Sequence, residues 1–175
     1  MPVFGVSSPT TALVLAWALV IAWTDWRHRR IPNLLSLGAW LVGICVLVFS
    51  GRSVLGAEPT SALLAAAGAL LVTLPGYLTK RLGAGDVKFL VAIGLLSSWP
   101  LTLICFTVGT LLGAAVGLLS RQRHSLYLAL PRVLQQPDSW LARWAARQPA
   151  ARHIPLGTCL SVGLIAALLT PPSLL

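Results

Sequence analysis

Long apolar runs joined by short connectors constrain the fold of this chain more than any other feature of its sequence. Each run is close to the ~20 residues that a helix needs to cross a hydrocarbon layer about 30 Å thick. With 57% hydrophobic and 10% charged residues, the chain cannot cover the surface of a soluble domain with polar groups. We therefore expect a single-domain (1–175), all-α polytopic membrane protein of about six transmembrane helices. The predicted spans are 3–23, 34–50, 61–79, 82–99, 100–119 and 154–170.

The fourth and fifth runs form one continuous apolar stretch, because Lys88 is the only charge between Val87 and Leu119. Such a stretch is too long for a single span. The segment Ser97-Ser98-Trp99-Pro100 is predicted to divide it, since serine and proline favour a turn. The fourth helix is then short unless it begins near Leu82.

Basic residues predict the orientation of the helices. Of the 13 Lys and Arg residues, only Arg52 lies in the connectors that follow the second and fourth runs. The others lie at or near the segments that follow the first, third and fifth runs, which the positive-inside rule places in the cytoplasm. We expect both termini outside. Asp25 and Asp86 are then both cytoplasmic, one leaving the first helix and one entering the fourth.

The net charge of +9 would suggest nucleic-acid binding in a soluble protein. Here the basic residues more simply set the orientation and contact anionic lipid, so we expect membrane lipid and no nucleic acid as a partner. In the basic loop 120–152, Asp138 can cap a short helix that has Trp140, Leu141 and Trp144 on one side. This pattern predicts a cytoplasmic interfacial helix between helices 5 and 6.

Other residue patterns indicate packing more than chemistry. Cys45, Cys105 and Cys159 lie in separate apolar runs, and the three histidines lack metal-ligand spacing, so we predict no metal site. Glycines at 109, 113 and 117 recur every four residues. This stripe favours close helix packing, either within the protein or in a homo-oligomer.

Two of the four acids lie where an ionised carboxylate is disfavoured. Asp86 follows the bend Gly83-Ala84-Gly85 at the start of the fourth run, and Asp25 follows the first run. Ionisable groups at membrane depth point to function. Two close carboxylates share one proton, so one can activate a water while the other polarises a carbonyl. No serine or cysteine nucleophile with a nearby base is evident, which makes hydrolysis by an activated water the simplest interpretation.

The same residues have simpler interpretations. Asp25 could pair with Arg27 or Arg29 and help to fix the topology. Asp86 could stabilise the first turn of its helix. Lys88 would not face Asp86 on a regular helix and is expected to reach the interface or a lipid phosphate. The glycines at 83 and 85 are expected to bend with positive φ and let an extended peptide approach.

The two acidic segments together resemble those of the type IV prepilin peptidases, which are membrane aspartic endopeptidases. Gly83-Ala84-Gly85-Asp86-Val87-Lys88 is similar to the GxGDxK motif of that family. Asp25, followed by Arg27, Arg30 and Ile31-Pro32-Asn33, resembles the other catalytic segment, an acid followed by basic residues and an IPN turn. Ile154-Pro155-Leu156-Gly157 is similar to a looser Pro-x-Gly element near the C-terminus of the family.

The resemblance implies an enzyme that removes the basic leader of prepilins or pseudopilins at the cytoplasmic face of the bacterial inner membrane. It implies Asp25 and Asp86 as catalytic acids and no cofactor for the peptidase reaction. It also suggests further site residues, namely Gly83, Gly85 and Lys88 in the active-site loop and Arg27, Arg30, Pro32 and Asn33 as substrate or lipid contacts.

The larger members of the family carry an N-terminal cytoplasmic domain with a cysteine quartet, which this sequence lacks. The chain thus resembles the short form that serves Flp-type or tight-adherence pilus systems. S-adenosylmethionine would be a cofactor only if the protein also methylated the new N-terminus. Two alternatives remain open, a small cation- or proton-coupled transporter and an assembly factor that binds pilins without cutting them.

Overall fold

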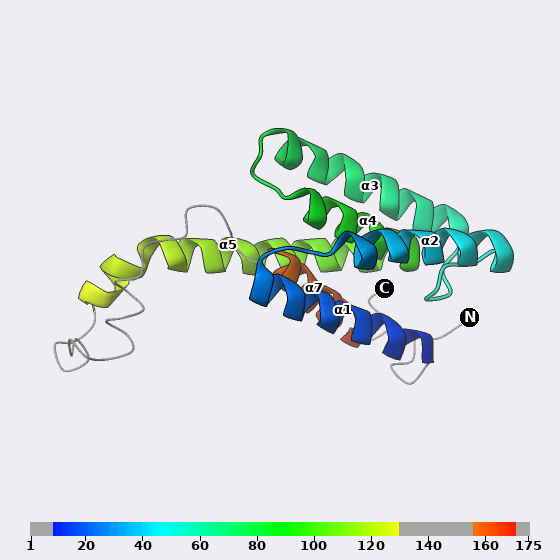
Figure 1. Cartoon of the computed structure of the whole chain (residues 1–175), viewed down its shortest axis with the longest axis horizontal. Helices are drawn as coiled ribbons and strands as arrows, with labels where there is room; N and C mark the ends of the chain where they lie inside the picture. The colour runs from blue at the N-terminus through cyan, green and yellow to red at the C-terminus, as the bar shows by residue number, and fades with distance from the viewer. Residues whose placement is uncertain (1–8, 130–155, 171–175) are drawn as a thin grey trace. The chain divides into compact units, whose positions relative to one another are not determined.

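The computed structural model describes residues 9–129 and 156–170, which contain six helices and no strand (Figure 1). The all-α prediction is therefore confirmed for these residues. Four helices, α1, α2, α3 and α5, are long and apolar enough to cross a membrane, and α7 is apolar but shorter. The helices are α1 (Pro9–His28), α2 (Asn33–Ser50), α3 (Pro59–Leu78), α4 (Ala84–Leu96), α5 (Trp99–Ala129) and α7 (Leu156–Leu169).

The chain forms two compact units. Unit 1 comprises Met1–Thr110 and Pro155–Leu175, and unit 2 comprises Leu111–Ile154. The described part of unit 2 is the C-terminal part of α5, which is helical as far as Ala129. The prediction of a loop from residue 120 is thus wrong for its first ten residues. Arginine, glutamine, leucine and alanine are strong helix formers, so the helix does not end where the apolar run ends.

The interfacial helix predicted around Asp138 and Trp140 lies outside the described residues. Other boundaries agree with the sequence. A break separates α4 from α5 between Leu96 and Trp99, as the Ser97–Pro100 segment predicted. Helix α3 begins with Pro59 at its first position, directly after Glu58.

Helix α1 ends later than the predicted span 3–23, and its last turn contains Asp25. The backbone N–H of Arg29 still donates to the carbonyl of Asp25 at 2.8 Å, and Arg29 then leaves the helix with φ 54°. The change of polarity after Trp23 does not interrupt backbone hydrogen bonding. Pro32, which disfavours helix at the preceding residue, follows only afterwards.

Helix α4 is the buried centre of unit 1 and packs against α2, α3 and α7. Val87 and all residues from Phe89 to Leu96 are buried, so the apolar surface covers every side of this helix. That distribution is typical of a helix enclosed by protein. Its 13 residues rise only about 20 Å, less than the ~30 Å of a hydrocarbon layer. The predicted span 82–99 is therefore too long, because Gly83 is extended and the helix ends at Leu96.

Small residues let the helices of unit 1 approach at backbone distance. A Cβ at Gly94 of α4 would lie 2.6 Å from the backbone nitrogen of Ala66 on α3. A Cβ at Gly109 of α5 would lie 2.8 Å from the Cα of Leu160 on α7. The close packing that the glycine stripe predicted is thus confirmed within the protein at Gly109.

Two tryptophans connect α1, α2 and α4. The Trp17 ring lies 5.2 Å from the Phe89 ring of α4, and its Nε1–H donates to the Leu35 carbonyl of α2 at 3.1 Å. The Nε1–H of Trp40 on α2 donates to the Lys88 carbonyl of α4 at 2.8 Å. Buried indole groups generally need such a polar partner. These contacts hold α1 and α4, which carry the two acids, in one assembly.

Candidate active site

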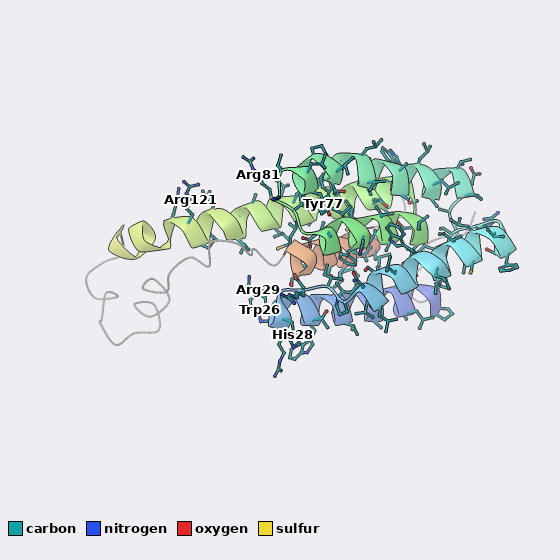
Figure 2. All side chains as sticks on the ribbon, turned by 45° about the horizontal axis from the view of Figure 1, so that its top comes forward. Trp26, His28, Arg29, Tyr77, Arg81 and Arg121 are labelled. Atoms are coloured by element: carbon teal, nitrogen blue, oxygen red, sulfur yellow. The ribbon has the colours of Figure 1, made fainter. Side chains whose placement is uncertain are left out.

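The end of α1, the connector to α2 and the bend between α3 and α4 lie at the same end of unit 1 (Figure 1). Figure 2 shows Trp26, His28 and Arg29 at the end of α1 and Arg81 at the bend. The two predicted acids belong to these segments. Sequence reasoning required both acids to lie at one end of the helix assembly, and the structure places them there.

The Asp25 carboxyl group is buried, with only 6% of the residue exposed. Its Oδ2 accepts a hydrogen bond from the Thr158 backbone N–H at 2.8 Å and another from the Thr158 hydroxyl at 3.1 Å. Thr158 is the third residue of α7, so the positive end of that helix dipole faces Asp25. The carboxylate that could have paired with neighbouring arginines is thus bound by the first turn of α7.

Asp86 is the third residue of α4 and is half-buried. Its carboxyl group interacts with the Gly83 backbone and is close enough to Asp25 for the two groups to interact electrostatically. An acid in a first helical turn also suits the dipole, as the simpler interpretation held. The structure therefore brings together two carboxyl groups that are far apart in the sequence.

Ile31 lies between the two acidic segments, and two glycines make room for it. A Cβ at Gly85 would lie 3.2 Å from the Ile31 Cβ. A Cβ at Gly157 would lie 2.8 Å from the Ile31 Cδ1 and 3.1 Å from the Asp25 Cγ. The Pro-x-Gly element thus contributes a residue to the site, because Gly157 lets α7 approach Asp25.

The expectation of positive φ at Gly83 and Gly85 is wrong. Gly83 is extended, with φ −78°, and the positive-φ glycines among the described residues are Gly51 and Gly56. The bend is formed instead by Lys80, with φ 56°, and by hydrogen bonds from the N–H groups of residues 81 and 82 to the Gly76 carbonyl. Gly85 is required for close approach and not for its backbone conformation.

Lys88 makes a contact that the sequence did not indicate. Its Nζ donates to the Asn33 Oδ1 at 3.1 Å, so the predicted lipid-facing lysine binds the start of α2. Arg27, Arg30 and Pro32 are exposed at the same connector. The structure does not test their predicted roles as substrate or lipid contacts. No cluster of metal-ligating side chains occurs among the described residues.

Thr158 is the site residue that sequence reasoning missed. It directly follows the Pro-x-Gly element and lies in the first turn of α7. Nothing local indicates that it contacts a residue 133 positions earlier. Only the packing of α7 against α1 reveals this contact.

A model of the type IV leader peptidase family matches residues 12–118, more than half of the chain. The chain belongs to the type IV leader peptidase family. The match confirms the resemblance inferred from the two acidic motifs, and it includes both Asp25 and Asp86 but ends before α7. No curated protein and no solved structure matches the chain. The family match identifies the chain as a peptidase, and four of its described helices are long and apolar enough to span a membrane.

In this leader peptidase, Gly85→Val is expected to lower the rate of leader cleavage about 10- to 100-fold. The new Cβ would lie 3.2 Å from the Ile31 Cβ, an atom next to the backbone that cannot rotate away. Displacement of the neighbouring Asp86 by a fraction of an ångström would misalign the two carboxyl groups. The measurement is the rate of leader cleavage, compared at equal amounts of each variant in the membrane. Gly38→Val is the control, since a Cβ at Gly38 meets nothing within 4 Å. Equal rates for both variants would contradict the prediction.

Proposed function

We propose that this leader peptidase is an aspartic endopeptidase that removes the leader of prepilins or pseudopilins, with Asp25 and Asp86 as its catalytic acids. One observation carries the proposal. The structure brings a buried carboxyl group on α1 within electrostatic range of a second one at the start of α4. Such a pair can hold one proton between its members, as general acid–base hydrolysis requires.

The reaction follows from that shared proton. The ionised carboxylate takes a proton from a water as the water oxygen bonds to the scissile carbonyl carbon, while the protonated carboxyl donates to the carbonyl oxygen. The tetrahedral intermediate then collapses: the carboxyl group that took the water proton gives it to the amide nitrogen, the C–N bond breaks, and a hydroxyl of the intermediate returns its proton to the other carboxylate. One water is consumed, and the pair again holds one proton for the next cycle.

We further propose that the site faces the cytoplasm of the bacterial inner membrane. The distribution of basic residues supports this orientation, since the site shares its end of unit 1 with the exposed residues Arg29 and Arg81 (Figure 2). A prepilin would then present its leader to the site from the side on which it is made. We expect the peptidase reaction to need no cofactor and S-adenosylmethionine to matter only if the product is also methylated.

Co-expression with the candidate prepilins tests this function. The intact protein is expressed with each prepilin, and leader removal is followed by gel shift and N-terminal sequencing. We expect a shortened pilin with the wild type and an uncut prepilin without it. A pilin that is bound but never shortened would favour the assembly-factor alternative. If the protein neither bound nor cut any of the candidate prepilins, the result would count against both the peptidase and the assembly factor and would favour a transporter.

A further inference from the structure

The two carboxyl groups of the site have unequal surroundings. The two hydrogen bonds that Thr158 donates to Asp25, from its N–H and from its hydroxyl, reach the same oxygen, Oδ2. Asp25 is only 6% exposed, and Oδ1 is the carboxyl oxygen that Thr158 does not contact. Asp86, by contrast, interacts with the Gly83 backbone and with Asp25.

Hydrogen bonds donated to a carboxylate favour its ionised form, and bonds to charged acceptors are the stronger ones. The first turn of α7 adds a favourable dipole at the same oxygen. The Thr158 hydroxyl has one proton and two acceptors within reach, the Asp25 Oδ2 and the Ala22 carbonyl at 3.2 Å. A charged Asp25 attracts this proton more strongly than the neutral carbonyl does, so ionised Asp25 and the donating hydroxyl reinforce each other.

We propose that Thr158 is a positioning residue that keeps the negative charge of the pair on Asp25 and leaves Oδ1 to take the proton from water. Asp25 is then the base and Asp86 the acid. This inference rests on the proposed function and deepens it. Titratable groups near Asp25 among the described residues include Asp86 on α4, Cys159 on α7 and Arg29 after α1. Arg29 is the only cation of these three, and it lies next to Asp25, since its backbone N–H donates to the Asp25 carbonyl.

Thr158→Val tests this role, because valine keeps the shape and the backbone N–H but removes the hydroxyl. We expect kcat for leader cleavage to fall roughly 10-fold, the equivalent of about one hydrogen bond to a charged group, with KM within about twofold. The acidic limb of the pH–rate profile should move to higher pH, since the base is protonated more easily without its donor. The apparent pKa of that limb belongs to the pair of carboxyl groups and not to one aspartate alone. Thr158→Ser should restore both kcat and the profile.

Thr110→Val is the matched control, since the Thr110 hydroxyl donates within its own helix to the Phe106 carbonyl at 2.7 Å. It should leave kcat and the pH profile unchanged. Wild-type values in Thr158→Val would overturn the inference while the proposed function stood. Equal impairment in Thr158→Ser and Thr158→Val would also overturn it, because the hydroxyl would then not be the active feature. A wild type that cuts no prepilin would remove the proposed function, and the inference with it.

Discussion

Asp25→Asn and Asp86→Asn are each expected to lower the rate of leader cleavage by about 10³-fold, within the 10²- to 10⁴-fold range of general acid–base groups. Asparagine keeps the size of the side chain but can neither accept a proton from water nor release one to a carbonyl. Asp25→Asn also replaces the charged acceptor of the two Thr158 donors with a neutral one. Time courses of leader removal at matched membrane levels measure the rates.

The double variant Asp25→Asn/Asp86→Asn should be no slower than either single variant. Groups that act as a unit show this non-additivity, since the loss of one member already removes the function of both. Glu58→Gln is the control in the described part of the chain, because Glu58 is exposed and makes no capping hydrogen bond. Asp138→Asn is a second control, at an acid outside the described residues. Multiplicative losses, or cleavage that persists without either acid, would show that the two aspartates do not act as a pair.

Gly94→Val is expected to have the largest effect on stability, with a destabilisation of about 3 kcal/mol or more, at the upper end for overpacked cores. A Cβ at this position would lie 2.6 Å from the Ala66 nitrogen and 2.8 Å from the Ala65 carbonyl carbon. Both are backbone atoms of α3, so no side-chain rotation relieves the contact. Helix α4 would have to separate from α3 along its buried length. Thermal unfolding of the detergent-purified protein measures the change.

Gly38→Val provides the comparison for that measurement. It adds the same β-branched side chain inside a helix, at a position where a Cβ meets nothing within 4 Å. The cost of valine in a helix is therefore common to both variants, and the difference between them isolates the contact between α3 and α4. A melting temperature for Gly94→Val equal to that of Gly38→Val would show that the two helices are not packed at backbone distance.

The features that the sequence predicted are those set by hydropathy and charge. The helical class, the break before Trp99 and the joint location of Asp25 and Asp86 all follow from apolar runs and the positions of basic residues. Such patterns show whether each segment favours an apolar or a polar environment. They therefore predict which segments are helices and which helix ends lie on the same side.

The features that the sequence did not predict depend on contacts between segments. Thr158 reaches Asp25 only because α7 packs against α1, and Ile31 requires glycine at 85 and 157 only because three segments converge on it. Hydropathy overestimated the length of α4 for a related reason. The hydropathy of a residue is the same whether lipid or protein covers it, so it does not show where the helix ends.

The enclosure of α4 also decides what holds the site in place. A helix that faces lipid takes its depth from the thickness of the bilayer and adjusts by tilting. Helix α4 is covered on all sides along Phe89–Leu96, so its neighbours and not the lipid fix its position. Asp86 sits at the start of this helix and Asp25 on a helix connected to it through Trp17. The spacing of the two acids is therefore a property of the protein's packing, and membranes of different thickness should leave it unchanged.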